Sequence, residues 1–116
     1  MNLKDLADIL NMDLCDTIER FGNNEMLFIK FLKKFSDDNT YNLLCESVET
    51  ENYDDIEKNA HTLKGIAANL GFKILENDSN NIVLAVRNKD FDKIPVLFDN
   101  LKNSYNMVIN NLLELE

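Results

Sequence analysis

Residues 53–72 read YDDIEKNAHTLKGIAANLGF, and apolar side chains recur there at alternating intervals of three and four residues. At about 100° per residue this spacing gathers them on one side of an α-helix, the side that we expect to face a core. A helix that opens at Tyr53 and ends before Gly71 is therefore predicted, since glycine commonly terminates helices. The residues of the expected core side are Tyr53, Ile56, Ala60, Leu63, Ala67 and Leu70.

The same helical spacing continues on both sides of this stretch, and strand signals are nearly absent. The chain has three glycines and one proline, Pro95, which is tolerable in the first turn of a helix. These features predict an all-α fold. Leu27, Phe28, Phe31, Leu32 and Phe35 form a broad apolar stripe of one such helix, which we expect to pack in the core. The further helices are expected over residues 3–10, 12–21, 25–35, 41–49, 72–88 and about 92–115, with 36–40 as either a break or a kink.

Length and composition indicate one soluble globular domain over residues 1–116, with 45% hydrophobic and 28% charged residues. The net charge of −9, from 21 acidic and 12 basic residues, disfavours nucleic acid as a partner because phosphates would be repelled. No apolar run approaches the roughly 18 residues of a membrane span, and the first ten residues carry acids where a signal peptide would be basic. We expect a cytoplasmic protein with no membrane contact. Cys15 and Cys45 lack any metal or redox spacing and are expected to be reduced thiols.

The single histidine, His61, shares a second stripe of the helix with Lys64, Gly65 and Ala68. This stripe is centred about 120° from the apolar one, so we expect the imidazole to face solvent. Glycine inside a helix costs about 1 kcal/mol relative to alanine, and a compensating role for Gly65 is to leave the imidazole open to the approach of another surface.

These residue types together favour a site that accepts a phosphoryl group. A neutral imidazole nitrogen is a competent nucleophile near neutral pH. Lys64 lies one turn from His61, with Cβ atoms about 5–6 Å apart, so its ammonium can reach an anion on the ring. Two alternatives stay open: an inert surface histidine, and a glycine that only allows two helices to pack closely.

The string AHTLKGIAANLGF, residues 60–72, resembles the signature of the histidine-containing phosphotransfer (HPt) domain. The pattern of that family is His-x-Leu-Lys-Gly, then small residues, then Leu-Gly. The resemblance extends upstream to residues 21–38 and 51–60 and so covers most of the chain. Ile66 departs from it, because the family often has serine or another small residue there. On the helix it lies away from the stripe of His61, so we expect altered packing and not a loss of phosphorylation.

The resemblance implies an up-down four-helix bundle with a short N-terminal helical extension. It further implies that His61 takes a phosphoryl group on Nε2 from the aspartyl phosphate of a receiver domain, with Lys64 as the charge partner, and passes it to another receiver. The partners would be response-regulator receiver domains and a hybrid histidine kinase, and Mg²⁺ would belong to the receiver. The chain itself would have no cofactor, metal or catalytic machinery of its own, and would be a phosphocarrier and not an enzyme. We expect a monomer, the default for a module that must expose its reactive face.

Ala68 and Phe72 continue the histidine stripe and are candidates for the surface on which a partner docks, although Phe72 could equally close the helix end as a buried contact. A function of another class also remains, a helical adaptor bundle with an inert histidine. Glu57, one turn before His61, could hold the imidazole or simply belong to a solvated acidic face. A di-metal bundle is disfavoured because its paired Glu-x-x-His motifs are missing.

Overall fold

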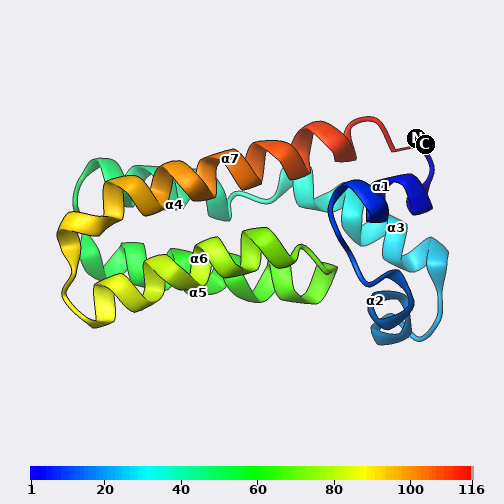
Figure 1. Ribbon diagram of the computed structural model, residues 1–116, viewed down its shortest axis with the longest axis horizontal. Helices are drawn as coiled ribbons and strands as arrows, with labels where there is room; N and C mark the ends of the chain where they lie inside the picture. The colour runs from blue at the N-terminus through cyan, green and yellow to red at the C-terminus, as the bar shows by residue number, and fades with distance from the viewer. Residues whose placement is uncertain (116) are drawn as a thin grey trace.

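The computed structural model describes residues 1–115, and within that range it contains helices and no strand (Figure 1). The all-α prediction is therefore confirmed. The elements are α1 (Leu3–Ile9), α2 (Leu14–Arg20), α3 (Glu25–Lys34), the 3-10 turn η1 (Phe35–Asp37), α4 (Thr40–Glu49), α5 (Tyr53–Leu70), α6 (Lys73–Arg87), the 3-10 turn η2 (Phe91–Lys93) and α7 (Ile94–Leu112). None of the helices in this range is both long and apolar enough to cross a membrane.

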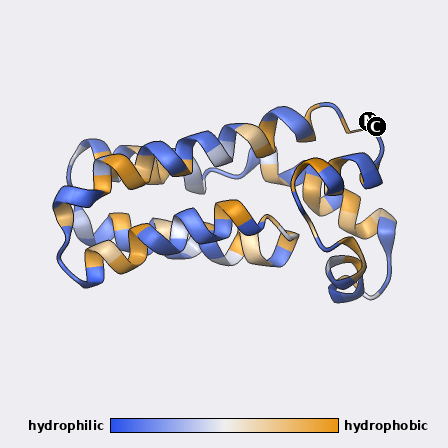
Figure 2. Ribbon diagram, viewed as in Figure 1, coloured by the Kyte–Doolittle hydropathy of each residue, from blue (hydrophilic) through white to orange (hydrophobic). Residues whose placement is uncertain are grey.

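The molecule is elongated, with extents of 40 × 23 × 20 Å. Helices α4, α5, α6 and α7 run along the long axis, and α1, α2 and α3 gather at one end (Figure 1). Helix α5 packs against both α4 and α6, and α6 packs against α7. Each helix alternates hydrophilic and hydrophobic segments along its length (Figure 2), as expected of helices that turn one side to a core.

The apolar side of α5 is buried as its spacing predicts. Five of its six residues are at most 4% exposed, namely Ile56, Ala60, Leu63, Ala67 and Leu70. The sixth, Tyr53, is half-buried at the start of the helix, where its ring stacks on Phe91 with centroids 3.9 Å apart. A second stack, Tyr41 on Tyr105 at 3.7 Å, joins α4 to α7. Burial raises the pKa of Tyr41 above its ordinary value, and a side-chain hydrogen bond with Cys45 raises it further by a smaller amount.

The segment 36–40, which the sequence left undecided, is a break. Helix α3 ends at Lys34, η1 follows, and Asp38 has an extended backbone with ψ 131°. The Asp38 carboxylate then accepts a hydrogen bond from the N–H of Thr40 (2.8 Å), where α4 begins. A short acidic side chain that binds nearby backbone in this way competes with helix continuation.

The predicted apolar stripe of α3 is only partly correct. Phe28, Leu32 and Phe35 are buried, but Leu27 is 37% and Phe31 is 42% exposed. The apolar stripe of this helix is thus wider than the core that covers it, and its edge faces solvent.

The turn between α5 and α6 is built on a left-handed residue, Gly71, with φ 87°. The N–H of Phe72 donates to the carbonyl of Ala67 (2.9 Å), which closes the helix end. The same hydrogen-bond pattern ends α4 at Glu51 (φ 53°) and α6 at Lys89 (φ 58°). In those two turns a residue other than glycine adopts the left-handed conformation.

Gly71 also lies against another helix, unlike Gly22, which has open space around it. A Cβ at this position would be 2.8 Å from Oγ1 of Thr17, a residue of α2 that is 1% exposed. One turn further along α2, a terminal nitrogen of Arg20 donates to the carbonyls of Ala68 (3.0 Å) and Asn69 (3.3 Å). The end of α5 is therefore held by α2 through both a close approach and hydrogen bonds.

We expect Gly71→Ala to lower the free energy of unfolding by about 2–4 kcal/mol, since the alanine would be strained at positive φ and would also collide with Thr17. Gly22→Ala is the matched control, because Gly22 has a similar φ of +66° and open space around it. It should cost only the strain, about 1–2 kcal/mol. Urea unfolding of both variants measures the difference. Equal losses would show that the contact with α2 adds nothing.

Candidate functional site

His61 is exposed on the outer side of α5. It lies between Ala60 and Leu63, which are fully buried, so the register of the helix is fixed by its core side and the histidine is directed outward. The first turn of α5 is capped by Asn52, whose side-chain oxygen accepts a hydrogen bond from the N–H of Asp55 (3.2 Å). The exposure expected of a modifiable histidine is present.

His61 borders an open hollow of about 440 Å³ at the surface of α5. Most of its wall comes from α5 itself, and one residue comes from the end of α6. The hollow is lined by Asp54, Glu57, Lys58, His61, Thr62 and Arg87. Charged groups of both signs thus surround the ring, and its open side faces solvent.

Gly65 has no packing role within the described chain. A Cβ built on it would meet no atom within 4 Å, apart from its own neighbours and helix backbone, and its φ is not in the left-handed region. This excludes the alternative in which the glycine lets two helices of residues 1–115 pack closely. The open space one turn after His61 is what the clearance hypothesis requires.

Lys64 is half-buried one turn after the histidine, on the same α5 face as predicted. Within residues 1–115 it forms no ion pair, whereas Arg20, Arg87 and Lys93 each pair with a carboxylate. Its ammonium is thus available to an anion that arrives at the ring.

Glu57 is engaged with Arg87. Its Oε1 accepts a hydrogen bond from Nε of Arg87 at 2.7 Å, a contact that joins α5 to α6. Neither of the roles considered from the sequence, a hydrogen bond to the imidazole or a solvated acidic face, describes this ion pair. Arg87 was missed because its partner is 30 residues away in the chain. A signal was present, since Glu57 and Arg87 each lie 15 residues from Phe72, at the turn of an antiparallel helix pair.

Of the two predicted docking residues, one is wrong. Phe72 is 1% exposed and its ring contacts that of Phe35 at a centroid distance of 5.3 Å, so it belongs to the core and cannot form a docking surface. Its position just after the left-handed Gly71 turns it inward against the end of α5, as the alternative reading of a buried contact has it. Ala68 is half-buried on the histidine stripe, two turns from His61.

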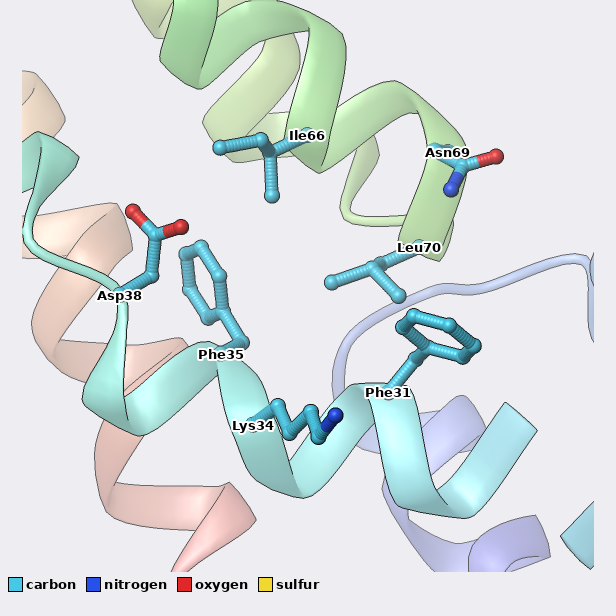
Figure 3. Close-up of a pocket in the computed structure, with 7 residues that line it drawn as sticks. All are labelled: Phe31, Lys34, Phe35, Asp38, Ile66, Asn69 and Leu70. Carbon is cyan, nitrogen blue, oxygen red and sulfur yellow. The ribbon is translucent and has the colours of Figure 1, made fainter. Parts of the chain in front are cut away.

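An apolar groove does lie near this face, between α3 and the last turns of α5 (Figure 3). In Figure 3 the ring of Phe31 lies next to Leu70, and the ring of Phe35 points toward Ile66 across the groove. Ile66 lines this groove and not the hollow of His61, which agrees with its expected place away from the histidine stripe. The groove is lined by Phe31, Lys34, Phe35, Asp38, Ile66, Asn69 and Leu70.

No protein-family model, curated protein or solved structure matches this chain. Among residues 1–115, no group of three or more histidine, cysteine or acidic side chains is placed so that it could hold a metal ion. The site combines an exposed imidazole, an ammonium that forms no ion pair with residues 1–115, a guanidinium and an open approach.

We expect Gly65→Ala to raise the free energy of unfolding by about 0.5–1 kcal/mol, because a methyl group at Gly65 adds helix propensity and meets no atom. Chemical denaturation measures the change. A loss of stability would mean that the helix needs glycine there for its own packing, and would remove the argument for clearance.

Proposed function

We propose that this chain is a histidine phosphotransfer protein, in which His61 accepts a phosphoryl group from the aspartyl phosphate of a receiver domain and gives it to another receiver. The observation that carries the proposal is the open space at Gly65. A helix-interior glycine that stabilises nothing within the described chain is explained when a second protein must come close to the neighbouring imidazole. The HPt-like string around His61 supports the same function.

The transfer needs only what the two partners supply together. The Nε2 lone pair of a neutral imidazole attacks phosphorus, an N–P bond forms, and the P–O bond to the aspartate breaks with the carboxylate as the leaving group. Lys64 then balances charge on the phosphoryl oxygens. The Mg²⁺ that phosphoryl transfer uses would be held by the receiver, so this chain would act as a phosphocarrier. The second transfer reverses these steps.

The arrangement of α4 to α7 along the long axis is compatible with an up-down four-helix bundle, with α1 to α3 as a helical extension across one end. In that fold the histidine stands on one helix of a rigid body, which suits a group that has to meet the pocket of a partner.

We place the partner over His61, Gly65 and Ala68. With Phe72 in the core, the apolar part of the docking surface is assigned to the groove between α3 and α5, where Phe31 is exposed and Ile66 is half-buried. The groove is close to the histidine stripe because Ile66 and Leu70 belong to the same helix. A receiver that contacts both would align its aspartyl phosphate with the open side of the ring.

The test is phosphoryl transfer from a chemically phosphorylated receiver domain in the presence of Mg²⁺. The parent chain should acquire a phosphate that is lost in acid, retained in base and located by mass on His61. His61→Gln should acquire none. If several phosphorylated receivers leave the folded parent unlabelled, the proposal is wrong and an adaptor function becomes the better explanation.

Two further variants test the roles of the neighbouring residues. Gly65→Leu should fold as the parent does. Its rate of phosphoryl transfer should be at least about tenfold below the parental rate, because the leucine side chain covers the approach to the ring. Lys64→Gln should lower the rate about tenfold through the loss of a charged contact. Lys102→Gln removes the same charge from α7, a helix that contributes no residue to the hollow of His61. This variant should transfer at the parental rate.

A further inference from the structure

The fold brings a second cation to the histidine, and this cation comes from another helix. Arg87 is the last residue of α6, and its guanidinium shares the hollow with His61. Glu57, one turn before His61 on α5, holds the guanidinium through the 2.7 Å contact between Nε and Oε1. The guanidinium is thereby directed to the side of His61 opposite to Lys64 along the helix.

The ion pair of Arg87 with Glu57 contributes little to the stability of the fold. The side chains of Arg87 and Glu57 are 53% and 34% exposed, and such pairs contribute only about 0–1 kcal/mol. An arginine presents five N–H donors, and within residues 1–115 the contact with Glu57 is the only hydrogen bond that the guanidinium makes. Its terminal amino groups remain free for another anion.

We propose that Arg87 binds the phosphoryl group of modified His61, and that it leaves Glu57 to do so. This inference rests on the phosphoacceptor function proposed above. A phosphoryl group carries close to two negative charges and offers three acceptor oxygens, which a planar guanidinium can bind in a bidentate manner. It is therefore a stronger partner than the single carboxylate of Glu57.

Glu57 has a defined part in this exchange. While the ring is unmodified, its carboxylate keeps the flexible arginine in the hollow, so that the cation is already in place when a phosphoryl group arrives. Lys58 also lines the hollow, but no ion pair within residues 1–115 holds its ammonium there. The arginine is the cation that the structure pre-orients.

The exchange can be followed on the phosphorylated chain itself. Phosphoramidate serves as the phosphoryl donor: the imidazole lone pair forms the N–P bond, the P–N bond of the donor breaks, and ammonia leaves. Nitrogen NMR then reports the Nε–H of Arg87 before and after labelling. We expect this signal to shift on phosphorylation of the parent and to stay in place when His61→Gln is treated identically.

A titration of the phosphoryl group gives an independent readout. A neighbouring cation favours the doubly charged form, so the second pKa of the phosphohistidine, followed by phosphorus NMR, should be higher in Arg87→Gln than in the parent by about 0.2–0.7 units. It should be lower than the parental value in Glu57→Gln, where the guanidinium is freed and one negative charge is lost. Asp54, Lys58 and Lys64 also face this region, but they are the same in all the variants compared.

Lys93→Gln is the matched control, because it removes one charge of another exposed ion pair, Lys93 with Asp90, which lies outside the hollow. Its phosphoryl pKa should equal that of the parent. Circular dichroism before and after heating establishes that every variant folds.

The outcomes separate this inference from the function on which it rests. A parent chain that phosphoramidate labels, but whose Arg87 signal and phosphoryl pKa do not respond, would overturn the role of Arg87 alone. Labelling by phosphoramidate with no transfer from any phosphorylated receiver would overturn the relay function, and the Arg87 signal would still decide whether the guanidinium binds the phosphoryl group. A folded parent that phosphoramidate does not label at all would overturn both.

Discussion

The close contact between Gly71 and Thr17 is the constraint on which the rest of the structure depends. Gly71 reverses the chain between α5 and α6 through its left-handed backbone, and its lack of a side chain lets Thr17 of α2 lie against the end of α5. Because the reversal is tight, the two long helices pair with a fixed register about Phe72. That register aligns their buried sides, and it also determines which surface residue of α6 stands next to each turn of α5. The core and the surface site are consequences of the same turn.

Gly65 and a core residue such as Phe72 differ in how their surroundings account for them. In a core, a side chain is explained by the atoms that it contacts, and Phe72 between the ends of two helices is an example. A Cβ at Gly65 would meet no atom within 4 Å, and in the proposed function the helix gives up about 1 kcal/mol of stability to leave that space to a partner. The surrounding helix tolerates the loss because five buried residues hold its other side. Stability and access are thus divided between the two sides of one helix.

Much of this could be predicted from the sequence, where a local pattern decided the outcome. The spacing of apolar residues placed α5 correctly and put His61 on its exposed side, since both facts depend only on the periodicity of a helix. The sequence could not decide whether residues 36–40 break the helix or kink it. Asp38 ends a helix only when its carboxylate accepts a hydrogen bond from a nearby backbone N–H, here that of Thr40. Phe31 was expected in the core, but its exposure depends on how far neighbouring helices extend, and no local pattern contains that information. Arg87 was missed for the same reason: its partner is close only after the chain has turned.

The pairing of Glu57 with Arg87 has a consequence for how this chain can change. Both residues are exposed, so many substitutions around them would be accommodated, but their meeting depends on the number of residues between each of them and the turn. Deletion of one residue within α6 before Arg87 would rotate the arginine by about 100° and shift it by about 1.5 Å along the axis. The number of residues between Glu57 and Arg87 is therefore more constrained than the identity of the exposed residues around them. Changes in length are better accommodated outside this segment, for example in the turns at Glu51 and Lys89.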